Sequence, residues 1–441
     1  MNFNHQTQPK IFYGWWIVLG GFSLTAVSSA FSYYGFGIFF NPLLEEFGWN
    51  AAVLGGALSL SRLESGFMAP LVGYLVDRIG PRKVMLVGVT LTGTGYILLS
   101  QTTSPLYFYV VFLLLVQGGA SAGMGSPPRI ATANWFRRKR GTALGLVTLG
   151  LSVGGIFARP LAEIITNLGW RTALIIGGVL IWIVGYPVSL IMRQRPEQFG
   201  YAPDGDVPET MDPISDPISS VANPTSGNIS PSKPSISSSQ EVNFSPMDAL
   251  KTRAFWTITL MFTSRQLVAG TVALFLVPLL QERGMSLTTA ASMVSIMALV
   301  GMPGRVGFGW LGDQFDKRKV LAFCFMMQSI GLILFTSLGG MLGLGFFLTL
   351  YAATYAGVNP LIPAIQGEYF GRQYFGTIRG LMTPISMLAV VSGPFIMTLI
   401  HDLSGSYEPA FIILAGVNLF ALVFILITKK PDPTITFSST D

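Results

Sequence analysis

The chain has 441 residues, of which 51% are hydrophobic and only 11% are charged. Because soluble globular proteins carry about 25% charged residues, this composition indicates a protein that uses lipid as its solvent. The single cysteine, Cys324, excludes a disulfide framework and a cysteine-based metal cluster. The formal net charge of +6 is compatible with nucleic acid or acidic lipid as a partner, so the positions of the charges must decide.

Apolar runs long enough to cross a bilayer recur along the chain, since a transmembrane helix needs about 20 mostly apolar residues. The first run is too long for a signal sequence, so we expect an uncleaved first helix. Six helices are predicted in the first half, near 11–40, 52–76, 82–100, 105–128, 141–165 and 171–193. Six more are predicted near 253–281, 287–311, 319–338, 342–369, 376–400 and 408–428. The sequence therefore predicts an all-α membrane protein of twelve transmembrane helices.

The stretch 196–250 interrupts the apolar runs and is rich in serine and proline. It contains Asp-Pro-Ile-Ser twice in succession, at 212–215 and 216–219. Such a segment buries too little apolar surface to offset its chain entropy, so we expect a disordered tether. The sequence thus predicts two six-helix bundles, residues 1–195 and 251–441, joined by this linker.

Lysines and arginines gather in one set of the connecting segments. That set contains Lys10, Arg78, Arg82, Lys83, Arg137, Arg138, Lys139, Arg140, Arg193, Arg195, Lys251, Arg253, Lys317, Arg318, Lys319, Arg372, Arg379, Lys429 and Lys430. The opposite set holds only Arg171 and Arg283. Because basic loops stay inside, we expect both termini and the linker to be cytoplasmic. The basic excess is then a topology signal, and nucleic acid is excluded as a partner.

A segment between the second and third helices recurs between the eighth and ninth. The two copies, residues 73–84 and 309–320, each contain a glycine, an aspartate four residues later and basic residues beyond it. Equivalent loops in two six-helix halves indicate a duplication, and parallel repeats imply a midplane site with alternating access. The positions that we assign to a conformational latch are Gly73, Asp77, Arg78, Gly309, Asp313 and Arg318.

The chemistry of the two copies explains why they would act as a latch. An aspartate at the C-terminal end of a helix opposes the dipole of that helix, so we expect Asp77 and Asp313 to face the N-terminus of a neighbouring helix. The glycines allow close helix packing, and the basic residues anchor the turn to lipid headgroups. The alternative is a basic loop that only sets topology.

These two segments resemble the signature loops of the major facilitator superfamily, and the resemblance covers essentially the whole helical chain. A narrower resemblance is to monocarboxylate porters and their bacterial oxalate/formate-type branch. It rests on the stretches 13–16, 34–40, 134–146, 154–171 and 195–206, and on Arg305 followed four residues later by Gly309. The resemblance implies that Arg305 binds a substrate carboxylate.

The chain departs from these families at four positions. Tyr34 stands where mammalian members have a lysine, and Gly301 stands where they have an acid. No lysine lies between Leu381 and Ile400, where oxalate exchangers carry one, and this argues against a dicarboxylate exchanger. Leu114 replaces the helix-four arginine of many proton antiporters. The missing acid leaves the proton without the family's usual carrier.

Ionisable groups deep in the membrane are rare and need a partner or a function, since each costs about 2.5–3.5 kcal/mol on insertion. Arg305 is the first candidate for substrate binding, because guanidinium matches a carboxylate bidentately and stays charged. The alternative is a structural arginine paired with an acid on another helix. Further candidates for substrate binding are Tyr34, Arg265, Gln117, Tyr355 and Asn359, for which helix packing is the alternative.

Glu64 is the deepest carboxylate and the candidate for proton coupling, because burial favours its neutral form. A structural salt bridge of Glu64 with Arg159 or Arg265 is equally compatible with the sequence. We expect Glu368 to meet Arg372 or Arg379. No metal-ligand cluster or phosphate-binding loop is evident, so no cofactor and no ATP drive are expected.

The sequence therefore predicts a secondary transporter that moves a small organic monocarboxylate, with a proton, across a bacterial inner membrane as a monomer. The alternatives are an organic anion exchanger, a drug exporter of the same fold, and a transporter-like sensor without turnover. An enzyme is not expected, because no nucleophile, base and orienting group can be grouped.

Overall fold

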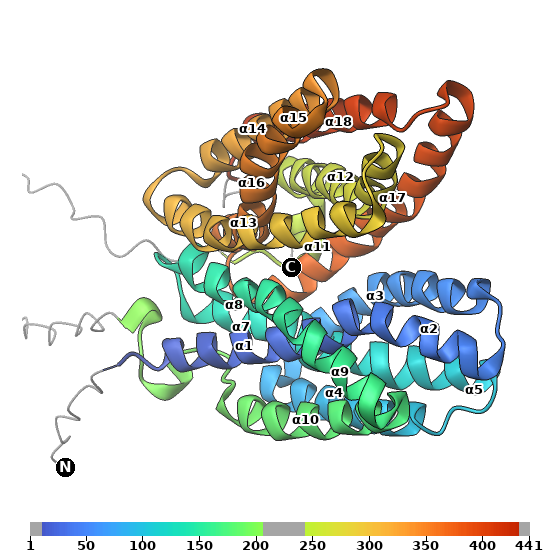
Figure 1. The fold of residues 1–441 in the computed structure, drawn as a ribbon. Coiled ribbons are helices and arrows are strands. Elements are labelled where there is room, and N and C mark those ends of the chain that lie inside the picture. Colours follow the sequence, from blue (N-terminus) through green and yellow to red (C-terminus); the bar gives the residue numbers. More distant parts are fainter. Residues whose placement is uncertain (1–10, 206–242, 432–441) are drawn as a thin grey trace, which may run out of the picture.

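The computed structural model describes residues 11–205 and 243–431, and this part of the chain is built from helices without strands. The helices form two bundles that lie side by side, the first blue to green and the second yellow to red (Figure 1).

The first bundle consists of six rods, several of them interrupted by π or 3-10 turns. They are α1 Gly14–Ser28 with η1 Ser29–Tyr34 and α2 Gly35–Phe47; α3 Ala51–Ile79; α4 Pro81–Leu99; α5 Pro105–Val110 with η2 Val111–Gln117, α6 Gly118–Ala120, η3 Ser121–Gly125 and α7 Pro127–Trp135; α8 Arg140–Gly154 with η4 Gly155–Phe157 and α9 Ala158–Leu168; and α10 Trp170–Ile191. Gly80 (φ 88°) precedes α4 and Gly169 (φ 82°) precedes α10, where a positive φ favours glycine.

The second bundle repeats this plan after the short helix α11 Pro246–Lys251. Its rods are α12 Arg253–Glu282; α13 Leu287–Gln314; α14 Lys317–Leu338; α15 Gly340–Phe346 with η7 Phe347–Ala352 and α16 Ala353–Phe370; α17 Phe375–Ser404; and α18 Glu408–Ile427. Thr252 and Ser286 cap the N-termini of α12 and α13 with their side chains, and a proline occupies the second position of α18. These residue types favour a helix start at these positions.

Ten helices of the described chain are long and apolar enough to cross a membrane. The remaining two rods are α3, with 29 residues, and α4, with 19 residues, which bring the total to twelve. Their polarity comes from Arg62 and Glu64 within α3 and from Arg82 and Lys83 at the start of α4. The predicted all-α architecture of two six-helix bundles is confirmed.

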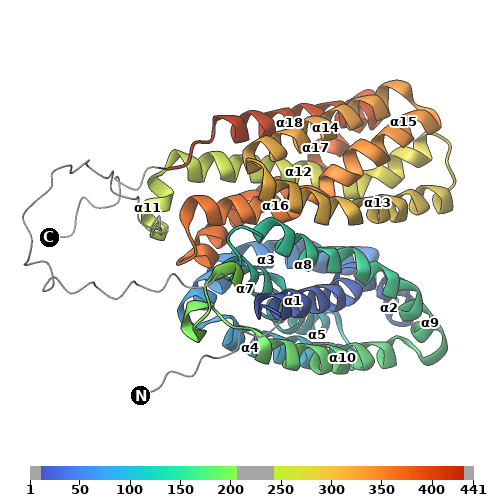
Figure 2. The same cartoon turned by 90° about the vertical axis from the view of Figure 1, so that its left-hand side faces the viewer.

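The turns between α3 and α4, α7 and α8, α13 and α14, and α16 and α17 all lie at one end of the molecule, which we call the basic end. In Figure 2 this is the side on which α7 and α11 lie, and the opposite side, where α9 ends and α15 begins, is the far end. Hydrogen bonds between the two bundles are concentrated at the basic end. Arg372 donates to the Asn134 carbonyl (2.7 Å) and to Glu197 (2.7 Å), and Arg195 donates to the Gln373 carbonyl (3.2 Å).

Both ends of the predicted linker pack on the bundles instead of being free. The ring of Tyr201 contacts Phe12 and Trp135, and the backbone N–H of Phe244 donates to the Phe370 carbonyl at 3.1 Å. Asp204 accepts hydrogen bonds from the backbone N–H groups of residues 137–139. Aromatic contacts and the Asp204 carboxylate thus hold the two ends of the linker on the bundles, although its composition predicted a disordered tether. The middle of the linker, 206–242, lies outside the described residues.

Candidate substrate site

A cavity of about 200 Å³ lies between the two bundles. Along α13 its lining runs from Val294, near the far end, to Arg305, so it reaches from the middle of the molecule toward the far end. The predicted substrate residues that line it are Tyr34, Arg265, Arg305, Tyr355 and Asn359. Among the described residues, this lining contains two guanidinium groups and no carboxylate.

Arg305 is held at the seam between the bundles. Its side chain is buried, and its Nε donates to Ser152 Oγ of α8 at 3.2 Å. The helices α8 and α13 approach closely here, because a Cβ on Gly145 would lie 2.6 Å from the Arg305 carbonyl oxygen. Arg305 precedes Asp313 by eight residues, which places it about 12 Å inside the basic end of α13. Helix–helix contact therefore fixes a permanent cation at the floor of the cavity.

Arg265 is oriented by the second bundle. It is buried, and its Nη2 donates to Asn359 Oδ1 of α16 at 2.8 Å. The guanidinium lies over the Tyr355 ring, with 5.2 Å between its carbon and the ring centroid. Tyr355 stacks in turn on the fully buried Tyr351 at 5.7 Å. An amide and an aromatic face thus position the second cation, and Tyr351 packs behind the site.

Tyr34 reaches the cavity from η1 in the first bundle. A Cβ on Gly155 would lie 3.0 Å from the ring carbon that carries the hydroxyl, so the glycine of η4 leaves room for the tyrosine. The phenol lies within electrostatic range of Arg305 and Tyr355. A phenol of the first bundle therefore faces Arg305 of the second.

Two predicted functional residues are not part of the cavity lining. Gln117 lies in η2 and is half-buried inside the first bundle. Glu64 is half-buried on α3 beside α6, since a Cβ on Gly118 would lie 3.6 Å from its Oε1. Ser65 Oγ lies 3.5 Å from Glu64 Oε2, a long contact for a hydrogen bond.

Three predicted ion pairs differ from what the structure contains. Arg159 pairs with Glu163 on its own helix at 3.0 Å, where both side chains are exposed, so it does not meet Glu64. Arg265 donates to the side-chain amide oxygen of Asn359 instead of pairing with Glu64. Glu368 pairs with Lys317 at 2.8 Å and not with the arginines on its C-terminal side. In each case the side chain binds a partner one helical turn away or on an adjacent helix, and not the partner that was predicted.

The two repeated aspartates close the basic end in matching ways. Asp77 accepts hydrogen bonds from the backbone N–H groups of Gly376 (3.1 Å) and Thr377 (2.7 Å), at the start of α17. Asp313 accepts from the backbone N–H groups of Gly141 (2.7 Å) and Thr142 (2.7 Å), at the start of α8. Each threonine hydroxyl also donates to the same carboxylate. The expectation that these aspartates face helix N-termini is confirmed, and both contacts cross between the bundles.

The glycines of the repeat bring the same helices into backbone contact. A Cβ on Gly73 would lie 2.1 Å from the Gly376 carbonyl oxygen, and a Cβ on Gly309 would lie 2.4 Å from that of Gly141. Beside them a cluster of apolar residues fills the space between the bundles. We call this cluster the plug; it comprises Val72, Val76, Val84, Ile130, Ala133, Leu144, Ala364 and Phe375.

The basic members of the repeat bind within their own halves. Arg78 donates to the Tyr74 hydroxyl at 2.7 Å. Arg318 pairs with Asp316 at 2.7 Å and donates to the Thr428 carbonyl at 3.3 Å. Hydrogen bonds from Arg318 hold the pKa of the Asp316 carboxyl below its ordinary value. These arginines brace the turns, while the aspartates bridge the bundles.

Two arginines that the sequence does not assign to substrate binding, Arg379 and Arg129, lie between the cavity and the basic end. Arg379 is counted among the basic loops, yet it lies one turn inside α17 and donates to the Gln366 side chain at 2.9 Å. Arg129 is half-buried on α7, and its Nε has no partner among the described residues. The number of residues between each arginine and the end of its helix is the feature of the sequence that indicates its depth.

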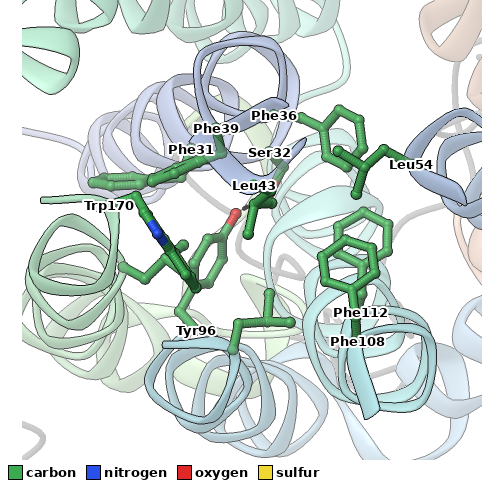
Figure 3. A pocket seen from close by; sticks show the side chains of 12 residues that line it. Phe31, Ser32, Phe36, Phe39, Leu43, Leu54, Tyr96, Phe108, Phe112 and Trp170 are labelled. Carbon is green, nitrogen blue, oxygen red and sulfur yellow. Dashed lines mark hydrogen bonds between the residues drawn. The ribbon is translucent and has the colours of Figure 1, made fainter. Parts of the chain in front are cut away.

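A second and much smaller pocket lies inside the first bundle (Figure 3). Aromatic rings surround it, including Phe31, Phe108 and Trp170, and the Ser32 and Tyr96 hydroxyls lie 3.3 Å apart at its edge. None of the described side chains that line it is charged. This pocket is therefore suited to apolar contents, and the cavity between the bundles is the candidate for an anion.

Two duplicated helical bundles with a charged cavity between them and bridging contacts at one end define a polytopic membrane transporter. The family model of the Major Facilitator Superfamily matches residues 22–383 and 306–440, and the chain belongs to that superfamily. Its relatives are transporters, so the chain is a transporter and not an enzyme.

Curated relatives are similar to this chain over nearly its whole length. Monocarboxylate transporter 12 of Xenopus laevis is 25% identical, with 99% of this chain and 94% of that protein covered. The oxalate:formate antiporter of Oxalobacter formigenes is 24% identical (91% and 88%) and the 4-hydroxybenzoate transporter PcaK of Pseudomonas putida 25% identical (91% and 89%). The chain is therefore related to transporters of monocarboxylates and other organic acids.

Among solved structures, the fucose:proton symporter FucP of E. coli superposes with a TM-score of 0.68 at 16% identity, covering 94% of this chain and 98% of that chain. The human organic anion transporter MFSD10 superposes with a TM-score of 0.66 at 16% identity, covering 93% and 98%. These likenesses show the fold alone.

Proposed function

We propose that this protein transports a small organic monocarboxylate by alternating access, binding the carboxylate at Arg305 and Arg265. The observation that carries the proposal is the inter-bundle cavity, whose lining, within the part of the chain that the structure describes, contains two buried guanidiniums and no carboxylate. A fixed pair of cations in a partly apolar cavity favours a small organic anion. Guanidinium binds carboxylate through two parallel hydrogen bonds, and Tyr34 supplies a further donor.

The relatives support this class of substrate. Their names include monocarboxylates, oxalate, formate and 4-hydroxybenzoate, all of which are carboxylates. No lysine lies between Leu381 and Ile400, and this favours a substrate with one carboxylate over a substrate with two. Because one chain supplies both bundles and completes the cavity, we propose a monomer as the functional unit.

We propose that the basic end faces the cytoplasm of a bacterial cell, as the distribution of lysine and arginine indicates. The cavity then extends toward the outside, and the plug and the two aspartate contacts close the inside. Movement to the inward-facing state must break the Asp77 and Asp313 contacts and divide the plug. Residues 73–77 and 309–313 are in this proposal the latch of the transport cycle.

For the proton we propose Glu64. It is half-buried inside a membrane-spanning helix, and in the described chain no basic side chain forms an ion pair with it. A carboxylate without a cation partner favours its neutral form at membrane depth and can load and unload a proton. Glu64 lies within one bundle, while the anion binds mainly to the other.

The test is uptake of radiolabelled lactate or pyruvate into proteoliposomes under an imposed pH gradient. We expect uptake to follow the gradient, to be lost in Arg305→Ala and to lose its gradient dependence in Glu64→Gln. Arg159→Gln, which removes an exposed charge paired with Glu163, is the matched control and should transport normally. Unchanged transport in Arg305→Ala would refute the binding site, and gradient-independent wild-type uptake would refute symport.

Anion exchange is the second candidate, because a cavity with two arginines can also hold an anion that is traded for another. In that case uptake requires an internal counter-substrate and ignores the pH gradient. The same proteoliposomes, loaded with unlabelled acid or left empty, distinguish exchange from symport.

A further inference from the structure

We propose that Arg129 and Arg379 form a second anion-binding position, which receives the substrate carboxylate on the basic side of Arg305. We call these two residues the inner arginine pair. The inference rests on the proposed function, since it assumes that a carboxylate leaves Arg305 toward the basic end. It goes further by assigning an exit site to residues outside the cavity lining.

The depths of four arginines form a series along the pathway. Counted from the basic end of its own helix, Arg379 lies about 6 Å deep and Arg129 about 9 Å, at 1.5 Å per residue. On the same count Arg305 lies about 13.5 Å deep and Arg265 about 18 Å. The inner arginine pair therefore continues, toward the basic end, the line of cations that begins in the cavity.

The four charges are close enough to interact. Arg129 lies within electrostatic range of Arg305 and Arg265, and Arg379 lies within range of Arg129 and Arg265. In the described chain no carboxylate forms an ion pair with Arg129 or Arg379. Arg379 is held instead by the neutral, buried Gln366 amide, at 2.9 Å. Such a cluster of like charges is unfavourable at membrane depth and leaves a place for an anion.

The plug lies directly beneath the inner arginine pair. Two members of the plug adjoin the pair in sequence. Ile130 directly follows Arg129, and Phe375 lies one turn before Arg379. A Cβ on Gly376 would lie 3.1 Å from the Ile130 side chain, so α7 and α17 meet at this level. In the observed state the plug separates the pair from the basic-end solution.

The two members of the pair belong to different bundles, and this determines when they act. Opening the basic end moves α7 away from α17 and divides the plug, so Arg129 and Arg379 become opposite walls of the exit. An anion released by Arg305 then meets them first, and an anion entering from the basic side meets them before Arg305. The pair should therefore affect affinity on the basic side and not on the far side.

The test compares right-side-out and inside-out membrane vesicles that contain Arg129→Gln or Arg379→Gln, with labelled lactate as the probe. We expect the half-saturating concentration on the basic side to rise about tenfold, as when a charge-assisted hydrogen bond is lost, and that on the far side to change less than about twofold. The lysine variants, which keep the charge, should recover most of the basic-side affinity.

Lys83→Gln is the matched control, because it removes an exposed charge at the same end without lying beneath the cavity. If it weakens the basic side equally, a general surface potential explains the effect and the inference is overturned. Equal effects on both faces, or none on either, would also overturn it. A wild type that takes up no monocarboxylate in either vesicle would overturn the proposed function, and with it this inference.

Discussion

At the scale of single residues, the chemistry of the cavity is set by what lies behind each arginine. Arg305 rests on Ser152 of the opposite bundle, whereas Arg265 is oriented by Asn359 and Tyr355 of its own. The deep position of Arg305 is evident from the sequence. The contact between Arg265 and Asn359 is not, because the two residues are 94 positions apart and only the packing of α12 on α16 joins them.

Asn359→Leu tests whether this orientation matters. The change leaves Arg265 Nη2 without its acceptor, and a lost hydrogen bond to a charged group corresponds to about 1.5–3 kcal/mol. We expect the half-saturating concentration of labelled substrate to rise about tenfold, measured by uptake into proteoliposomes. Gln117→Leu, which makes the same polar-to-apolar change away from the cavity, should have no effect. Equal losses in both variants would contradict the assigned lining.

At the scale of the elements, π-helical turns occur in the rods that surround the cavity. The segment η1 carries Tyr34 to the cavity on one side and Phe31 to the aromatic pocket on the other (Figure 3). The segment η7 carries Tyr351, on which Tyr355 stacks. Such turns are frequent at functional sites, where they rotate side chains out of the regular pattern. A helical period of 3.6 residues cannot predict such turns, so the face of the helix on which Tyr34 lies was not predictable from the sequence.

The glycine contacts between helices yield a prediction about the closed basic end. In Gly309→Ala the new methyl group would lie 2.4 Å from the Gly141 carbonyl oxygen, so α8 and α13 must separate. Overpacking of this kind costs about 1–3 kcal/mol and should favour the open basic end by tenfold or more. We would measure this as faster thiol labelling, from the basic side, of Ala364→Cys in a Cys324→Ser background. Ala364 is part of the plug and fully buried.

Gly307→Ala is the control for this prediction, because it lies on the same helix and a Cβ there meets nothing within 4 Å. Its labelling rate should equal that of the parent. If both alanine variants label at the same rate, the backbone contact at Gly309 does not hold the basic end closed.

At the scale of the whole molecule, the repeat was the most informative part of the sequence. Two equivalent loops predicted two bundles, an inter-bundle site and aspartates facing helix N-termini, because duplication constrains all three together. The ends of the linker were not predictable in this way. Tyr201 and Phe244 pack on rings that lie far away in sequence, and a serine-rich composition conceals them. The position of Arg379 inside α17 was not predictable either, because an arginine in a basic loop and one in the first turn of the next helix have the same sequence context.

The orientation of the molecule decides which way the observed cavity faces, and it can be tested directly. In a Cys324→Ser background, a cysteine replacing Lys319 lies at the basic end and a cysteine replacing Ser404 lies at the far end, and both positions are exposed. Because basic loops stay inside, a membrane-impermeant maleimide should label Ser404→Cys in intact cells and Lys319→Cys only after permeabilisation. The reverse pattern would mean that the plug closes the outside. The inner arginine pair would then guard entry instead of exit.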